Sequence, residues 1–137
     1  MCGSLARLLR MCGHDAAYAL DRGVEDDTAL RALARAEGRT LLTRDAELAR
    51  RSADAVLLTS KDTDGQLREL AAEGVSLELT APTRCGACNG ELERASGPYP
   101  AYVADDAEAV WRCPDCGQYF WRGSHWEDLR ERLESLH

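Results

Sequence analysis

The chain has 137 residues, with 17 basic and 24 acidic side chains and a formal net charge of −7 at pH 7. Its hydrophobic fraction of 45% is enough for a folded core and excludes a chain that is disordered throughout. No apolar run approaches the roughly 18–20 residues that span a bilayer, so we expect a cytoplasmic protein that does not enter a membrane. The acidic balance argues against indiscriminate binding of nucleic acid and still permits a local basic site.

The composition of the chain changes near Pro82, a residue that continues neither a helix nor a strand ladder. Tyr18 is the only aromatic residue before this point, and four of the six cysteines follow it. We therefore expect two domains, formed by residues 1–82 and residues 83–137.

The first domain alternates helix-like and strand-like segments. Leucines at positions 5, 8 and 9 have helical spacing, and Gly13 is placed to end that helix. The further segments expected in chain order are an apolar run at 16–20, a helix between Asp26 and Gly38, a strand at 40–43, a helical turn at 46–49, a strand at 55–59, a helix at 66–73 and a strand at 75–79. This alternation predicts an α/β domain, with a parallel sheet that helices cover on both faces.

The second domain is expected to hold short strands and a final helix. Ser124 and Glu127 have the spacing of a capping box. Trp126, Leu129 and Leu133, with Leu136 after them, then recur at helical spacing and predict one apolar face.

Four cysteines of the second domain form two CxxC pairs. The pairs are Cys85–Cys88 and Cys113–Cys116, with residues 89–112 between them. Four thiolates suit a tetrahedral Zn²⁺ ion and leave no open position on it, so we predict a structural zinc ribbon. Glycines 90 and 117 follow the pairs and would supply the positive φ that turns backbone N–H groups toward sulfur. Disulfides, redox chemistry and an iron centre are the alternatives. The remaining cysteines are Cys2 and Cys12, and Cys12 is expected to be a small core residue.

Aspartates gather where the predicted parallel strands end. Asp45 follows the strand at 40–43, Asp62 and Asp64 follow the strand at 55–59, and Asp26 and Asp27 open the intervening helix. Chemistry in parallel sheets collects at this edge, and carboxylates there could hold Mg²⁺ or Mn²⁺ for phosphodiester cleavage. The alternative is that each aspartate only caps a helix.

Two groups of arginines are candidate contacts for RNA phosphates. Arg7 and Arg10 share a helix face, and Arg39 and Arg44 flank the expected acidic site. Aromatic residues accompany arginines in the second domain and could stack bases, or could instead fill a small core; this set is Trp111, Arg112, Tyr119, Trp121, Arg122 and Trp126. His125 is either a general acid or base or a packing residue.

Three segments resemble the Mut-seven C-terminal ribonuclease domain family: residues 3–10, residues 37–45 and residues 111–126. The likeness extends over essentially the whole chain. It implies a PIN-like nuclease fold fused to a zinc ribbon, and a metal-dependent ribonuclease acting on RNA. By motif, Asp45 and Asp27 (or Asp26) would be catalytic acids, and Asp62 or Asp64 a weaker fourth candidate.

The chain departs from that family's pattern at its start. Members usually begin with an apolar strand and an aspartate just before the segment that is Met1-Cys2-Gly3 here. The expected PIN-like sheet therefore lacks its first strand and a principal metal ligand. Either the true start lies upstream or catalysis has been lost. The alternatives to a ribonuclease that hydrolyses RNA are thus a catalytically inactive RNA- or protein-binding module and a toxin-like nuclease with a partner antitoxin.

Overall fold

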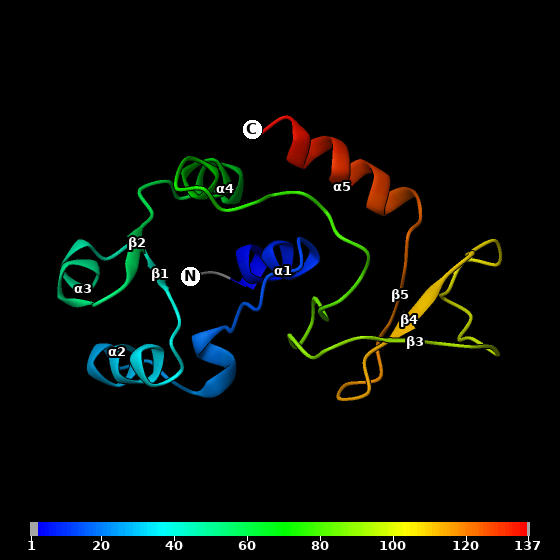
Figure 1. Ribbon diagram of the computed structural model, residues 1–137, viewed down its shortest axis with the longest axis horizontal. Coiled ribbons are helices and arrows are strands. Elements are labelled where there is room, and N and C mark those ends of the chain that lie inside the picture. The colour runs from blue at the N-terminus through cyan, green and yellow to red at the C-terminus, as the bar shows by residue number, and fades with distance from the viewer. Residues whose placement is uncertain (1–2, 137) are drawn as a thin grey trace. The chain divides into compact units, whose positions relative to one another are not determined.

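The structure is a computed structural model, and residues 3–136 are described (Figure 1). Predictions that concern Met1 and Cys2 lie outside these residues. The chain divides into two compact units: the first comprises the residues up to Ala6 and Ala17–Val75, and the second comprises Arg7–Ala16 and Ser76–His137. Helix α1 (Gly3–Met11) contributes residues to both units. A domain boundary near Pro82 stays a prediction.

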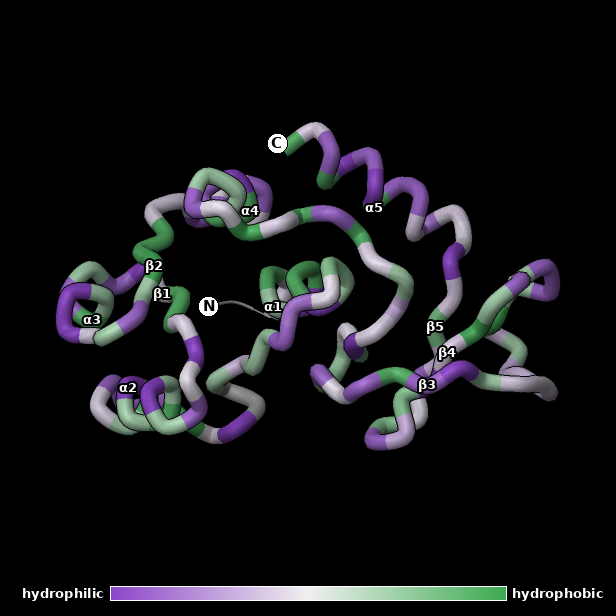
Figure 2. Tube along the Cα trace, viewed as in Figure 1, coloured by the Kyte–Doolittle hydropathy of each residue, from purple (hydrophilic) through white to green (hydrophobic). Residues whose placement is uncertain are grey.

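A parallel pair of strands lies at the centre of the first unit. Strand β1 (Leu41–Thr43) pairs with β2 (Ala55–Leu57), with Leu41 opposite Ala55 and Thr43 opposite Leu57. Helix α3 (Ala46–Arg51) connects them. Strand β2 and the two leucines that begin β1 are hydrophobic, and both strand labels stand beside green segments in Figure 2. The predicted mixed α/β class with a parallel sheet is confirmed.

Two longer helices of the first unit begin at aspartate caps. Helix α2 (Asp27–Ala36) follows Asp26, and α4 (Thr63–Ala72) follows Asp62. A short 3₁₀ helix, Ala19–Arg22, precedes α2. Glycines 38 and 74, which follow α2 and α4, have φ values of 65° and 91°, a conformation that ends helices.

The strand expected at 75–79 is wrong. The first unit's sheet contains only β1 and β2 within the described residues, so this segment has no strand beside it. Leu77 is nevertheless buried, at 1% exposure. Val75 and Leu79 are half-buried, and Ser76 and Glu78 are exposed, so the alternation of apolar and polar residues at 75–79 reflects burial along one side of the segment rather than strand pairing.

The second unit contains a three-stranded antiparallel sheet. Its order is β3 (Glu93–Arg94), β4 (Val110–Arg112) and β5 (Tyr119–Trp121). Helix α5 (Ser124–Glu134) follows, and Leu129, Leu133 and Leu136 are buried as predicted. The predicted capping box is wrong, because Gly123 occupies the N-cap and Ser124 is already inside the helix. No described helix is long and apolar enough to cross a membrane.

Candidate functional site

The four cysteines of the second unit converge on one point. Their sulfur atoms all lie within 4.8 Å of one another. The Sγ atoms of Cys85 and Cys116 are 3.6 Å apart, as are those of Cys88 and Cys113. Zn–S bonds of about 2.3 Å in tetrahedral geometry place neighbouring sulfurs about 3.8 Å apart. The cluster can therefore hold a metal ion such as zinc.

The two CxxC pairs are built as matching turns. The Asn89 amide donates to the Cys85 carbonyl at 2.8 Å, and the Gly117 amide donates to the Cys113 carbonyl at 2.8 Å. Asn89 and Gly117 occupy the same place in the two turns and have φ values of 70° and 80°. The positive φ predicted for Gly90 is thus found at Asn89, one of the few residue types that tolerate it.

Gly90 is needed for space rather than for its backbone conformation. A Cβ atom at this position would lie 2.7 Å from Asp115 Oδ2 and 3.0 Å from Cys113 Sγ. Real Cβ atoms essentially never approach other atoms that closely. Gly90 therefore allows the first turn to approach the sulfurs of the second.

The protein environment raises the pKa of some of these thiols and lowers that of another. Burial raises the pKa of Cys85 to about 12 and also raises the pKa of Cys88. Burial alone would raise the pKa of Cys113 too, but the backbone N–H of Cys116 and the thiol of Cys88 hold it below its usual value. Outside the cluster, burial raises the pKa of Cys12 to about 11, as expected for an inert core thiol.

The first cysteine turn is fastened to residues 10–16. Arg10 is 4% exposed and donates to the carbonyls of Gly86 at 2.9 Å and Ala16 at 2.8 Å. Asn89 accepts from the Ala16 amide at 3.0 Å and donates to Asp15 at 2.6 Å. The contacts of Arg10 are structural, and its role in RNA binding stays a prediction. Sequence reasoning missed Asn89 and Asp15, because nothing in their spacing indicates a contact so distant along the chain.

Three of the predicted catalytic aspartates cap helices. Asp26 accepts from the Ala29 amide at 2.9 Å, and Asp62 accepts from the Gly65 amide at 2.8 Å. Asp45 accepts from the amides of Glu47 and Leu48 at 3.0 and 3.2 Å. Asp27 and Asp64 lie in the first turns of α2 and α4. Asp26, Asp45 and Asp62 are therefore helix caps, and a catalytic role stays a prediction for all five aspartates.

The aspartates do not form a compact ligand group. Among residues 3–136, the four cysteines are the group in which three or more possible ligand atoms lie close together. Asp45 and Asp62 nevertheless follow β1 and β2, whose parallel pairing brings their carboxyl ends to one edge. Arg44, also at this edge, is exposed, whereas Arg39 precedes β1 and pairs with Glu37 at 2.8 Å. Arg39 and Asp45 thus lie at opposite ends of β1, and a role of Arg39 beside the acidic residues stays a prediction.

Glu69 is an acidic residue of this edge that sequence reasoning missed. Its carboxylate accepts from the Thr59 amide at 2.9 Å and from the Thr59 hydroxyl. These bonds, with a further bond from Ser60 and the charge of Arg44, hold the pKa of Glu69 below its usual value. Glu69 lies within α4, and its partner Thr59 lies ten positions earlier, before the helix begins, so no spacing in the sequence indicates their contact.

Arginines and aromatic rings interleave on the second unit. The Arg122 guanidinium lies 5.6 Å from the Trp111 ring centroid and 6.0 Å from that of Trp126. Arg112 lies 6.0 Å from the Tyr119 ring. Tyr102, which is 51% exposed, packs near Tyr119 and Trp121. His125 is exposed in the first turn of α5, with no contact that identifies a catalytic role.

Comparison with known proteins gives one finding. The family model of the Mut7-C RNAse domain matches residues 1–133, nearly the whole chain. No curated protein and no solved structure matches significantly. The parallel α/β unit and the four-cysteine centre both lie within the matched residues. The chain belongs to the Mut7-C RNAse domain family.

Proposed function

We propose that this protein is a ribonuclease that uses a divalent metal ion to hydrolyse phosphodiester bonds of RNA, and that its four cysteines hold a structural zinc ion. The observation that carries the proposal is the family match along residues 1–133. Four cysteine ligands close the coordination sphere of zinc, so this ion shapes the second unit and takes no part in cleavage.

Asp45 is the leading candidate for the carboxylate that holds the catalytic metal ion. Both capping amides bond to its Oδ1, so Oδ2 accepts no hydrogen bond from a described residue. Mg²⁺ is often held by one or two carboxylates together with substrate phosphates, an arrangement that needs no three-residue protein cluster. A divalent ion bound there would activate water and offset negative charge. Asp62, Asp26 and Asp27 are the further candidates, and all three side chains are exposed.

Exposed arginines provide the contacts that we propose for RNA phosphates. Arg44 adjoins Asp45, and Arg7 and Arg122 are exposed on the second unit. Guanidinium groups match the geometry of phosphate oxygens. Arg10 is buried, and it bonds the carbonyls of Ala16 and Gly86 within the second unit.

A second candidate function is a catalytically inactive module that binds RNA or protein. The observation that favours it is that acidic side chains of residues 3–136 form no group of three possible ligands. Helix capping already accounts for three of the candidate aspartates, Asp26, Asp45 and Asp62.

A cleavage assay with labelled RNA distinguishes these two functions. The protein is freed of other divalent metals but keeps zinc at its four cysteines, and Mn²⁺ is then added. Asn caps helices about as well as Asp, so Asp45→Asn keeps the cap and removes the charge. Asp128→Asn, which changes an exposed residue of α5, is the matched control. We expect Mn²⁺-dependent cleavage by the wild type and the control, and strong loss in Asp45→Asn at an unchanged melting temperature. Equal cleavage by all three proteins would remove Asp45 from the mechanism. RNA binding without cleavage by the wild type would favour the inactive module.

A further inference from the structure

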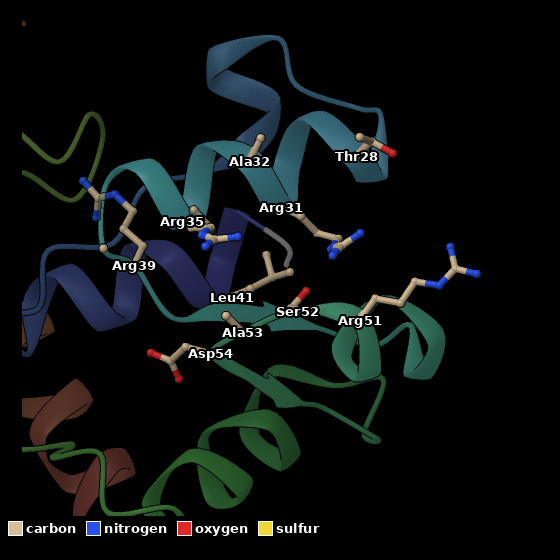
Figure 3. Close-up of a pocket in the computed structure, with 12 residues that line it drawn as sticks. Thr28, Arg31, Ala32, Arg35, Arg39, Leu41, Arg51, Ser52, Ala53 and Asp54 are labelled. Atoms are coloured by element: carbon tan, nitrogen blue, oxygen red, sulfur yellow. The ribbon is translucent and has the colours of Figure 1, made fainter.

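We propose that the first unit contains a second site, a pocket that binds the phosphate group of a nucleotide. The pocket has a volume of about 560 Å³, and four arginines line it: Arg31, Arg35, Arg39 and Arg51. In Figure 3, Arg31 and Arg35 extend from α2 on the side of Leu41, and Arg39 and Arg51 lie on opposite sides of them. This pocket is distinct from the zinc centre and does not depend on the ribonuclease activity.

The position of the pocket separates it from the acidic edge. Leu41, which lines the pocket, is the first residue of β1, and Asp54 immediately precedes β2. The pocket therefore lies toward the amino ends of both strands, whereas Asp45 follows the carboxyl end of β1. Asp45 is four positions after Leu41, which corresponds to about 13 Å in extended chain.

The charges in the pocket are unbalanced. Arg39 pairs with Glu37 at 2.8 Å, and Arg51 pairs with Glu47 at 2.8 Å. Within the described part of the chain, neither Arg31 nor Arg35 pairs with a carboxylate. Among the described residues that line the pocket, Asp54 is the one acidic residue, and the Thr40 hydroxyl donates to it at 2.7 Å. The two positive charges of Arg31 and Arg35 are therefore opposed within the pocket lining by a single carboxylate, in a protein of net charge −7.

Two features of Arg31 and Arg35 indicate an anionic ligand. They are four residues apart on α2, a spacing at which like charges on a helix repel each other. The Nε atom of Arg31 is also buried without a hydrogen-bond partner among the described residues. An anion between the two guanidinium groups would relieve the repulsion, and it would offer Arg31 an acceptor once the side chain turns toward it.

The shape and lining of the pocket favour a nucleotide over a bare anion. Its volume lies in the range of small-molecule sites, roughly 300–1,000 Å³. Alanines and Leu41 supply apolar lining for a sugar and a base beside the arginines. Guanidinium groups grip phosphate through paired N–H donors. The phosphate could belong to a free nucleotide or to a nucleotide within an RNA strand.

Calorimetric titration of the full chain at low ionic strength tests this site. The probes are adenosine 5′-monophosphate, a short single-stranded RNA, inorganic phosphate, and adenosine as the phosphate-free control. The variant is Arg31→Gln with Arg35→Gln, and the matched control is Arg68→Gln on α4, an exposed arginine that does not line the pocket. Arg35→Gln alone, which changes an exposed side chain, replaces the double variant if that protein does not fold.

We expect the double variant to bind the phosphate probes at least roughly tenfold more weakly than the wild type and Arg68→Gln do. If the double variant binds adenosine monophosphate more weakly, the pocket takes a free nucleotide. If only its binding of the RNA is weaker, the pocket takes a nucleotide within an RNA strand. Unchanged binding of every probe by the variant, or equal affinity for adenosine and its monophosphate, overturns the proposal. The pocket lies toward the amino ends of β1 and β2, and Asp45 follows the carboxyl end of β1, so weaker binding of adenosine monophosphate by the double variant reports on the pocket and not on the ribonuclease site.

Discussion

Arg10 and Gly86 are joined by a buried hydrogen bond of 2.9 Å that spans 76 positions of the chain. The same guanidinium donates to the Ala16 carbonyl at 2.8 Å. One side chain thus holds both the loop after α1 and the first cysteine turn, which makes it a structural centre of the second unit.

Replacement of Arg10 should destabilise the protein. Arg10→Met keeps much of the side-chain volume but leaves two carbonyls without their charged donor, which we expect to lower the free energy of unfolding by about 2–3 kcal/mol. Arg7→Met on the exposed part of the same helix should change it by less than about 0.5 kcal/mol. Urea denaturation followed by circular dichroism measures both, and equal effects would contradict the role of Arg10.

The zinc centre should determine whether the second unit folds. Purified protein is expected to contain one zinc per chain, and Cys113→Ser should lose it, because three ligands no longer close the site. Metal analysis measures the content, and tryptophan fluorescence reports unfolding, since all three tryptophans lie in the second unit. Zinc-free protein with the fluorescence and stability of the wild type would contradict a structural metal.

Two glycines near the cysteines should respond differently to substitution. Gly90→Ala introduces a Cβ atom 2.7 Å from Asp115 Oδ2, so we expect weaker zinc binding and a lower melting temperature. Gly117→Asn meets no such contact, and Asn89 already adopts the same conformation in the matching turn. We therefore expect Gly117→Asn to retain zinc. Competition with a chromogenic chelator measures the zinc affinity of each variant. Tighter zinc binding by Gly90→Ala than by Gly117→Asn would contradict these roles of the two glycines.

The cap at Asp45 gives a stability prediction that does not depend on catalysis. Asp45→Ala removes the acceptor of two α3 amides and should cost about 1 kcal/mol of unfolding free energy. Asp45→Asn keeps a side-chain oxygen that accepts from the α3 amides, so it should lower the free energy of unfolding by only about a few tenths of a kcal/mol. Thermal melts of the two variants test the difference, and equal destabilisation would show that charge, not the cap, matters there.

The lowered pKa of Glu69 predicts a specific pH dependence. Its stabilising contribution is complete above the unfolded value of 4.5 and is lost as pH falls through the lower folded pKa. The melting temperature of Glu69→Gln should therefore lie below that of the wild type at pH 7, and the gap should narrow toward pH 3. Glu25→Gln, an exposed change in the same unit, serves as the control. A gap that does not vary with pH would contradict the assignment.

The parts of the fold that local rules determine could be predicted from the sequence. Helices α2 and α4 have aspartate caps and terminal glycines, and the CxxC pairs fix their own turns. The strand expected at 75–79 failed because alternation records burial and not the presence of a neighbouring strand. The capping box at Ser124 failed because its spacing does not decide which residue begins the helix.

Candidate sites set by local spacing could also be predicted from the sequence, and those that depend on tertiary contacts could not. The four metal-binding cysteines could be found because their spacing is itself the site. Glu69 and the pair Arg31 and Arg35 were missed, since their significance comes from neighbours that only the folded chain supplies. Arg10 looked like a surface cation in the sequence, but its helix places it in the interior.

The bond between Arg10 and Gly86 also has a consequence for how the chain is made. Residues 10 and 16 are synthesised more than seventy positions before Gly86 and Asn89, which hold their hydrogen-bond partners. The second unit must therefore close a long loop before it is complete, a step that contact-order arguments make slow. A chain that ends before Cys85 would leave the Arg10 guanidinium without its Gly86 acceptor, so the second unit forms this bond only after the first cysteine turn has been made.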